Sequence, residues 1–165
     1  MAVASKSGAI AVAATALVAS LTAATALAVP PPPSSTFKGK TNQPKAPSHR
    51  VRVTTDANGH VSGMLVGWRA KCKGKGINWD GETSVTGGTN GLPQNGDVFI
   101  NNGSYTGHAS HGITGKITIA SKGQFTDNDH ANGTWSAKVI VMNKKGKKID
   151  KCKSPKIKWS VKRVA

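Results

Sequence analysis

Runs of residues that alternate between apolar and polar side chains dominate the chain after residue 36, and helical periodicity is almost absent. Because successive side chains of a strand point to opposite faces, each run predicts a strand with one buried and one solvent-facing side. Glycine and asparagine, which suit turns, separate the runs. The pattern predicts an all-β fold, either an antiparallel β-sandwich of jelly-roll or immunoglobulin-like type or a barrel, and we favour the sandwich.

The clearest predicted hairpin spans residues 50–72, with Asn58-Gly59 as a turn that tolerates positive φ at both positions. Its return strand directs one apolar set toward the core: Met64, Val66, Trp68, Ala70 and Cys72. Further strands are expected at residues 79–85, 96–101, 115–121, 134–142 and 155–164. In the last three of these the predicted inward set is Ile117, Ile119, Trp135, Ala137, Val139, Val141, Ile157, Trp159 and Val161.

The first 28 residues have the pattern of a secretory signal peptide. Lys6 precedes an alanine-rich apolar stretch, and Ala26-Leu27-Ala28 fits the small-x-small cleavage rule. We expect a cleaved signal helix at 1–28, a proline- and serine-rich tether at 29–36 and one β-sandwich domain at 37–165. The protein would then be secreted and extracellular, without a stable membrane anchor. A retained anchor is the alternative, because the stretch is about long enough to span a bilayer.

The chain has two cysteines, Cys72 and Cys152. In an oxidising compartment such a pair indicates a disulfide, which would close a loop of about 80 residues and stabilise the fold by roughly 4–5 kcal/mol. A catalytic or metal-binding thiol would need a nearby histidine or a C-x-x-C spacing, and the sequence has neither beside these residues.

The disulfide also suggests a strand pairing. We expect the strand that ends at Cys72 to pair with the last strand, which would place Arg69 and Lys71 beside Lys156 and Lys158. A disulfide that links two different sheets is the competing arrangement.

The chain is strongly basic, with a formal net charge of +16. Such a charge attracts anions and says little about fold. An exported protein seldom meets nucleic acid, so the expected partners are anionic polymers or glycans of the cell envelope rather than nucleic acid. We expect a monomer that needs no cofactor. Solubility alone is the other explanation of the charge.

The basic residues gather on both sides of the two cysteines, and a disulfide would bring these clusters together. The candidate anion-binding patch is Arg69, Lys71, Lys73, Lys75, Lys144, Lys145, Lys147, Lys148, Lys151, Lys153, Lys156 and Lys158. Contact with polyanions is one interpretation. Protection of exposed strand edges, where lysines discourage edge-to-edge association, is the other.

One strand carries residues of the type found in glycan sites. Asp80 and Glu82 share a face of the predicted strand beside Trp79, whose ring could stack on sugars. A solvated edge explains the two carboxylates equally well, and packing in the core or against a loop explains Trp79. We therefore predict no catalytic residue and keep Trp79 as a possible glycan platform.

Metal ligands are sparse, and we predict no metal site. Asp127-Asn128-Asp129 offers oxygen atoms suited to calcium, although turn chemistry explains the same residues. His108 and His111 could hold zinc only if a turn brought them together. The alternative functions are a carbohydrate-binding module that uses Trp79, a secreted protease inhibitor that presents a loop at residues 87–96, and a small hydrolase.

Several motifs occur in an order that resembles a group of small secreted bacterial proteins of unknown function, common in actinobacteria. The motifs are Phe37-Lys38-Gly39-Lys40-Thr41-Asn42-Gln43, similar to a G-x-T-x-Q opening strand, Asn58-Gly59-His60-Val61, Trp68-Arg69-Ala70-Lys71-Cys72, Gly103-Ser104-Tyr105, Gly133-Thr134-Trp135-Ser136-Ala137, and Cys152 before Ile157-Lys158-Trp159. The likeness covers nearly all of residues 37–165. It implies a β-sandwich with one cysteine pair and no assigned activity.

Overall fold

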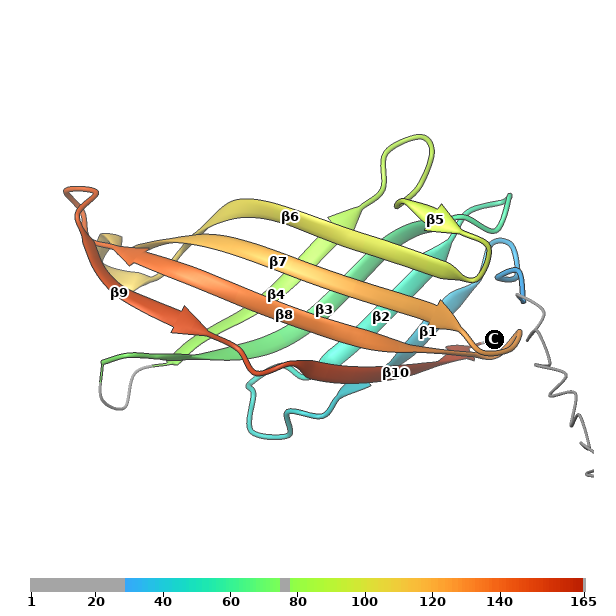
Figure 1. Cartoon of the computed structure of the whole chain (residues 1–165), viewed down its shortest axis with the longest axis horizontal. Helices are drawn as coiled ribbons and strands as arrows, with labels where there is room; N and C mark the ends of the chain where they lie inside the picture. Colours follow the sequence, from blue (N-terminus) through green and yellow to red (C-terminus); the bar gives the residue numbers. More distant parts are fainter. Residues whose placement is uncertain (1–28, 75–77, 165) are drawn as a thin grey trace, which may run out of the picture.

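Ten antiparallel strands make up most of the computed structural model, which describes residues 29–74 and 78–164 (Figure 1). The elements are β1 Thr36–Thr41, β2 Arg50–Thr55, β3 Val61–Cys72, β4 Asn78–Thr86, β5 Gln94–Asn95, β6 Val98–His108, the short 3-10 turn η1 Ser110–Gly112, β7 Thr114–Phe125, β8 His130–Met142, β9 Lys148–Lys153 and β10 Ile157–Val164. The predicted signal segment lies outside the described residues. Within those residues, no helix has the length and apolar character required to cross a membrane.

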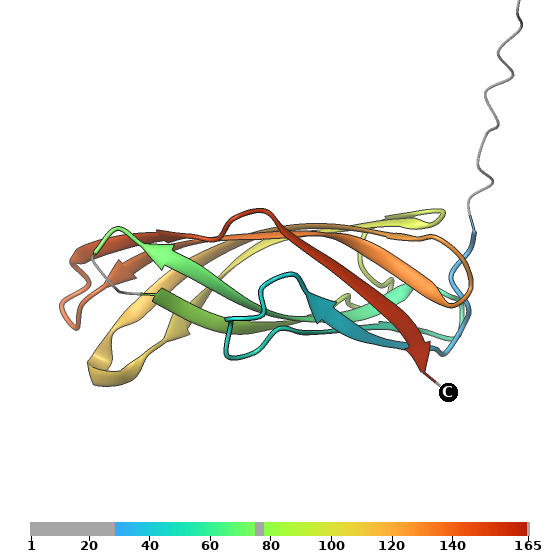
Figure 2. The same ribbon diagram turned by 90° about the horizontal axis from the view of Figure 1, so that it is seen from below.

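Hydrogen bonds link all the strands into one sheet whose pairings close into a ring. The ring runs β10-β1-β2-β3-β9-β8 and returns to β10, while β7, β6 and β5 extend from β8 and β4 pairs with β3. Two views at right angles show that β6, β7 and β8 form one layer and β1 to β4 cross behind it as the other (Figure 1 and Figure 2). The all-β antiparallel prediction is confirmed, and the jelly-roll or immunoglobulin-like type stays a prediction.

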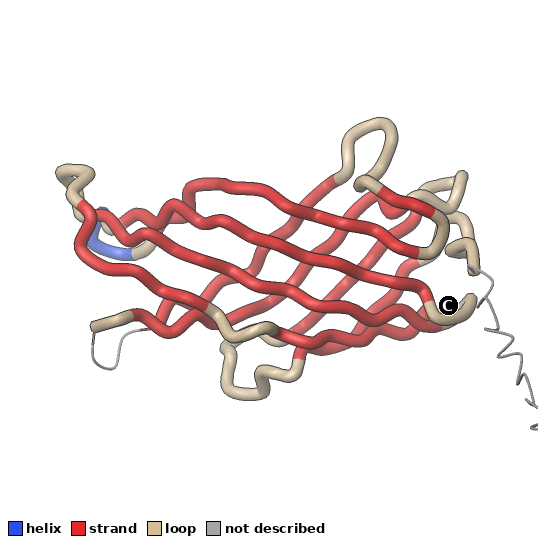
Figure 3. Tube along the Cα trace, viewed as in Figure 1, coloured by secondary structure: helices blue, strands red, loops and turns tan. Residues whose placement is uncertain are grey.

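Ser154 joins two strands that share one edge of β8. β9 pairs with the second half of β8, where Lys153 lies opposite Lys138, and β10 pairs with the first half. Between them, Ser154 Oγ accepts a hydrogen bond from Ala137 N at 2.8 Å, and Ser154 N donates to Ala137 O at 2.9 Å. The short connection satisfies the backbone of β8 while the chain moves from one neighbour to the next (Figure 3).

Gln43 fills the corresponding gap on β3, between β2 and β9. Its Nε2 donates to Arg69 O at 3.1 Å, and its Oε1 accepts from Arg69 N at 2.9 Å. The side-chain amide therefore replaces a strand residue at the one place where neither β2 nor β9 reaches β3. This contact gives the glutamine of the G-x-T-x-Q motif a structural role.

The predicted hairpin forms between β2 and β3, but its turn differs in detail. Only Gly59 has a positive φ, of 81°. The Asp56 carboxylate accepts hydrogen bonds from the N–H groups of Asn58 and His60, and the register shifts between Thr54 and Thr55. A bulge thus takes up an extra residue, so that one position rather than two requires the left-handed conformation.

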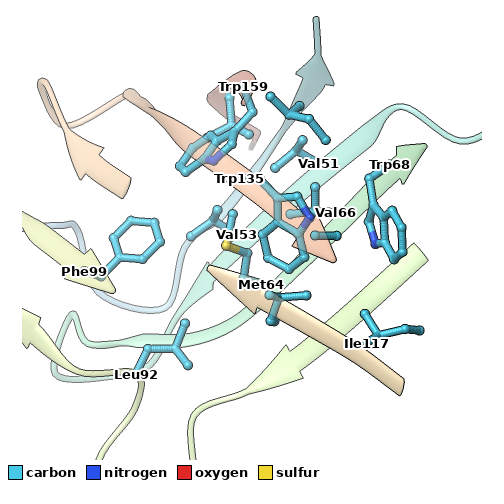
Figure 4. Packing of buried hydrophobic residues seen from close by; sticks show 14 of the residues in the cluster. Val51, Val53, Met64, Val66, Trp68, Leu92, Phe99, Ile117, Trp135 and Trp159 are labelled. Atoms are coloured by element: carbon cyan, nitrogen blue, oxygen red, sulfur yellow. The ribbon is translucent and has the colours of Figure 1, made fainter. Parts of the chain in front are cut away.

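The core lies between the two layers and contains the residues that alternation predicted (Figure 4). The predicted inward residues of β3, β7, β8 and β10 are buried, except that Cys72 is only partly buried. The strand expected at 96–101 is the longer β6, and its buried residues are Phe99 and Asn101, whereas Ile100 is 42% exposed. Phe37, Phe125 and Phe99 form an aromatic cluster with ring centroids 5.2 and 5.7 Å apart in successive pairs.

Residues 29–36 do not form the solvated tether that their composition predicted. Pro31 is buried, and Thr55 Oγ1 donates a hydrogen bond to Pro32 O at 2.6 Å. Ser34 N donates to Asp56 O at 2.7 Å, which ties the segment to the turn between β2 and β3. Proline and serine favour an extended, solvated segment, but the Thr55 hydroxyl and the Asp56 carbonyl of this turn form hydrogen bonds with its backbone.

Replacing Gln43 tests the closure of the ring. Gln43→Ala leaves the N–H and C=O of Arg69 unpaired at a partly buried position, so we expect a loss of about 1–3 kcal/mol in the free energy of unfolding. Urea denaturation measures the loss. Gln124→Ala, which removes only a hydrogen bond to Asp97 on the surface, is the control. A Gln43→Ala protein as stable as this control would contradict the structural role.

Candidate anion-binding site

The Cys72–Cys152 disulfide forms, as the sequence predicts, and it joins directly opposed residues of β3 and β9. The Cα atoms are 3.8 Å apart. The predicted partner strand was wrong, because β9 lies beside β3 while β10 pairs with β1 and β8. Residues 148–153 alternate only weakly, with lysines around Ile149 and Cys152, so alternation did not indicate a strand there.

The pairing of β9 aligns three lysines across neighbouring strands. Lys71 of β3 lies opposite Lys153 of β9, which in turn lies opposite Lys138 of β8. Adjacent strands are about 4.7–4.9 Å apart, so these backbone positions are close neighbours. Like charges placed directly opposite each other destabilise a sheet unless something neutralises them. We call Lys71, Lys153 and Lys138 the first cation row.

A shallow hollow of about 570 Å³ lies over the disulfide and contains the first cation row. Besides both cysteines, Thr118, Val139 and Ile140, it is lined by six lysines: Lys71, Lys73, Lys116, Lys138, Lys151 and Lys153. We call it the lysine hollow. Sequence reasoning missed Lys116 and Lys138 as members. Alternation marks both as outward-facing, but only the β7–β8–β9 pairing brings them beside the disulfide.

The remaining residues of the predicted patch lie elsewhere. Lys148 borders an adjoining hollow with Lys73 and Lys151. Lys156 lines a separate hollow of about 450 Å³, which Lys153 also borders. Lys158 pairs with Thr134 on the first half of β8, away from β9. The turn between β8 and β9 carries Lys144, Lys145 and Lys147, and Lys75 lies outside the described residues.

Arg69 belongs to the predicted patch but is already paired. Its guanidinium donates to both carboxylate oxygens of Asp80, with Nε–Oδ1 and Nη2–Oδ2 distances of 2.6 and 3.0 Å. This pair neutralises Arg69 from within the protein and raises the pKa of the guanidinium, chiefly through the hydrogen bond to Asp80.

None of the lysines in the described residues has a carboxylate partner within ion-pairing distance. The ion pairs there join arginine or histidine to acids: Arg50–Glu82, His60–Asp56, Arg69–Asp80, His130–Asp127 and Arg163–Asp129. Asp97 accepts from Gln124, and Asp150 accepts from backbone N–H groups. All seven acidic residues of the chain therefore have other hydrogen-bonding partners, and Asp150 alone feels a lysine charge, that of Lys73, which helps to lower its pKa.

Asp150 anchors the chain beside the disulfide. Its carboxylate accepts hydrogen bonds from Lys73 N at 3.2 Å, Gly74 N at 3.1 Å and Lys151 N at 2.6 Å. These backbone donors, that of Lys151 first, lower the pKa of Asp150. The pKa of Lys148 is also lowered, chiefly by its close contact with the Lys151 ammonium, which reflects the crowding of positive charge.

The positions of the lysines fit the protection of strand edges only at the beginning of β9. β4 has one unpaired edge, and β6 has one that β5 covers only at Val98 and Phe99. Neither β4 nor β6 contains a lysine. Lys71, Lys116, Lys138 and Lys153 stand on paired stretches of strand instead, whereas β9 pairs with β3 only at Cys152 and Lys153 and leaves the edge of its first residues open.

Trp79 packs inward. It is partly buried against the core, and a Cβ added to Gly115 of β7 would lie 2.7 Å from its ring. The core-packing explanation thus accounts for Trp79, whereas a sugar platform requires an open ring face. Asp80 and Glu82 point to solvent, and each is held by an arginine.

The other candidate sites have structural explanations. Asp127 accepts hydrogen bonds from Asp129 N and from the His130 ring, as in a turn. In the described part of the chain, no group of three or more His, Cys, Asp and Glu side chains could hold a metal ion. The loop at residues 87–96 projects from the body, but its large side chain, Leu92, is buried at 5% exposure. Its exposed tip, residues 88–90, offers only glycine, threonine and asparagine.

Comparison of the chain with protein-family models, with curated proteins and with solved structures gives no match. The candidate site therefore depends on its own geometry: a disulfide that fixes β9, and lysines without acidic partners around it.

Removing the disulfide tests its contribution to the fold. Cys72→Ser/Cys152→Ser opens a loop with a sequence separation of 80 residues. We expect a loss of about 4 kcal/mol in the free energy of unfolding, because the unfolded chain regains conformational entropy. Urea denaturation of the variant and of the oxidised protein gives the difference. A difference below about 1 kcal/mol would show that β9 is held without the disulfide.

The pH dependence of stability tests the role of Asp150. Since its folded pKa is lowered, its contribution is complete above the unfolded pKa of about 4 and is lost as the pH falls through the lower folded value. The stability advantage over Asp150→Asn should be constant above pH 5 or so and shrink in acid. Thermal unfolding of both proteins across this range measures it. A difference that does not change with pH contradicts the assignment.

Proposed function

We propose that this protein is a secreted, non-enzymatic binding protein that adheres to anionic polymers of the cell envelope or extracellular space through the lysine hollow. The observation that carries the proposal is the first cation row, in which three lysines lie opposite one another on adjacent strands and none forms an ion pair. The proposal also explains why β9 is fixed by a disulfide at this position.

An external anion would relieve the repulsion within the row. The acids of the described residues are paired with arginine, histidine, an amide or the backbone, so none of them forms an ion pair with a lysine. A polyanion that spans several lysines neutralises them together and releases bound salt ions, which favours binding at low ionic strength. The repulsion among the lysines in the free protein and its relief by a bound anion both support binding of a polyanion at this row.

Hydroxyl groups beside the lysines favour a polymer that also carries hydroxyls, such as an acidic polysaccharide. The first cation row continues from Lys138 to Thr118 of β7 and Ser104 of β6, and Ser104 Oγ donates to Thr118 Oγ1 at 3.1 Å. The O–H of Thr118 remains free to donate a hydrogen bond to a sugar, and the oxygen lone pairs of both hydroxyls can accept one. The large exposed apolar side chains of the described residues are aliphatic, so they offer no aromatic platform on which the bases of a single-stranded nucleic acid could stack.

Export and fold type belong to the same proposal. Residues 1–28 have the pattern of a signal peptide, and an extracellular location suits a disulfide, which cytosolic reductants would open. We further propose a sandwich of jelly-roll or immunoglobulin-like type, related to the small secreted bacterial proteins whose motif order the chain resembles. The absence of catalysis is supported by Asp80 and Glu82, whose carboxylates are held by arginines rather than directed at a common substrate position.

Charge removal in the first cation row tests the proposed function. We expect Lys71→Gln/Lys138→Gln/Lys153→Gln to weaken binding to polygalacturonate by at least threefold and up to about a hundredfold at low salt, because each exposed ion pair contributes roughly 0.2–1 kcal/mol. Fluorescence anisotropy with labelled polymer gives the affinity. The dependence of affinity on salt should also become shallower.

A matched control separates the site from the net charge. Lys144→Gln/Lys145→Gln/Lys147→Gln removes the same charge from the turn between β8 and β9, outside the lysine hollow. The account requires a clearly smaller loss of affinity from this control. Equal losses would mean that binding follows net charge, and no binding by the unaltered protein would refute the proposed function.

A further inference from the structure

A second row of directly opposed cations lies across three other strands. Lys162 of β10 is opposite Lys38 of β1, and Lys38 is opposite Arg52 of β2. All three residues are exposed. We call them the second cation row. Neither the composition nor the clustering of lysines around the cysteines indicated this row. Lys162 is 110 or more positions away from Arg52 and Lys38 in the sequence, and only the closure of the ring places it beside them.

The second cation row also lacks internal counterions. Within the described residues, none of its three members forms an ion pair. Arginines next to the row in the sequence bind two of the acids: Arg50 forms an ion pair with Glu82, and Arg163 forms one with Asp129. The row therefore repeats both properties of the first one, direct opposition and the absence of an acidic partner.

The registers give the distance between the two rows. On β3, the first row contains Lys71, whereas Leu65 is the residue opposite Arg52 of the second row. Six residues of strand span roughly 20 Å. On β8, the first row contains Lys138, and His130 is the residue opposite Lys162 of the second row. The eight residues of strand between His130 and Lys138 span roughly 26 Å. The two rows are thus roughly 20–26 Å apart along the strands, with Lys122, Lys156 and Lys158 near β8 between them.

The two rows lie toward different ends of the molecule. The first row centres on β9, at the end of the molecule that carries the turn between β8 and β9 (Figure 1). The second row lies on β1, β2 and the last part of β10, near the opposite end where the chain terminates (Figure 2). Each row runs across its strands, and the two rows are offset along the strands, so a polymer aligned with one row does not meet the other, whereas two separate polymer chains reach both.

We propose that the protein bridges two anionic polymer chains, one held at the lysine hollow and one at the second cation row. This inference rests on the proposed function and adds a consequence to it, namely that the molecule cross-links a polymer network instead of only coating it. The ligand class is the same at both rows, a linear acidic polysaccharide. Two sites on one rigid, closed sheet fix the spacing of the two chains at about 20 Å or more.

Stoichiometry with a short ligand tests the two sites. Tetragalacturonate is too short to bridge the two rows, so isothermal titration should give two oligomers bound per unaltered protein. Lys38→Gln/Arg52→Gln/Lys162→Gln and Lys71→Gln/Lys138→Gln/Lys153→Gln should each bind one. The control Lys144→Gln/Lys145→Gln/Lys147→Gln carries the same charge change and should still bind two. Far-UV circular dichroism confirms that each variant is folded.

Cross-linking is measured with long polygalacturonate by dynamic light scattering. The unaltered protein and the control should increase particle size at least severalfold at intermediate protein-to-polymer ratios and less in protein excess, because excess protein saturates each chain separately. Each row variant should bind the polymer without this increase.

The outcomes distinguish the two proposals. One tetragalacturonate per unaltered protein, or cross-linking that survives loss of the second row, overturns bridging and leaves the proposed function standing. A control variant that loses cross-linking as fully as the row variants also overturns bridging, because net charge would then explain it. No binding of oligomer or polymer overturns both proposals.

Discussion

The pairing of β9 with both β3 and β8 is the contact on which the rest of the molecule depends. It closes the ring of strands, and the Cys72–Cys152 disulfide fixes its register. That register places Lys71, Lys153 and Lys138 in one row. Ser154 and Gln43 complete the seam by bonding to backbone groups that no strand reaches. Fold closure and charge alignment thus have the same origin.

The distribution of charge gives this geometry its functional meaning. Arginine and histidine form the internal ion pairs, and arginine suits that role because its planar guanidinium matches a carboxylate. Lysine, a compact charge on a flexible stem, is left without acidic partners on the outer face. Exposed pairs contribute little to stability, so the arrangement costs the fold little and leaves the lysines available to external anions.

Much of the fold could be predicted from alternation, because one buried face imposes a period of two on β3, β7, β8 and β10. β9 could not, since lysines occupy half of its positions and its stability comes from pairing with β3 and β8 and from the disulfide. The disulfide itself was predictable from the two cysteines, but its partner strand was not. Pro31 shows the same limit, because its burial depends on a turn that composition does not reveal.

The candidate site was predictable only in part. Lysines near the cysteines were visible in the sequence, whereas Lys116 and Lys138 join the site through cross-strand register. The second cation row depends on contacts between the beginning and the end of the chain. Trp79 could not be assigned from its neighbours, since the space over Gly115 that it fills lies on another strand.

The most direct test of the central claim is to map the backbone amides of isotope-labelled protein by NMR during titration with tetragalacturonate. The account predicts chemical-shift changes on β3, β9 and β8 around Lys71, Lys153 and Lys138, and bridging adds a second set on β1, β2 and β10 around Lys38, Arg52 and Lys162. Changes confined to β4 around Trp79 or to the loop at residues 87–96, with the cation row unaffected, would contradict it.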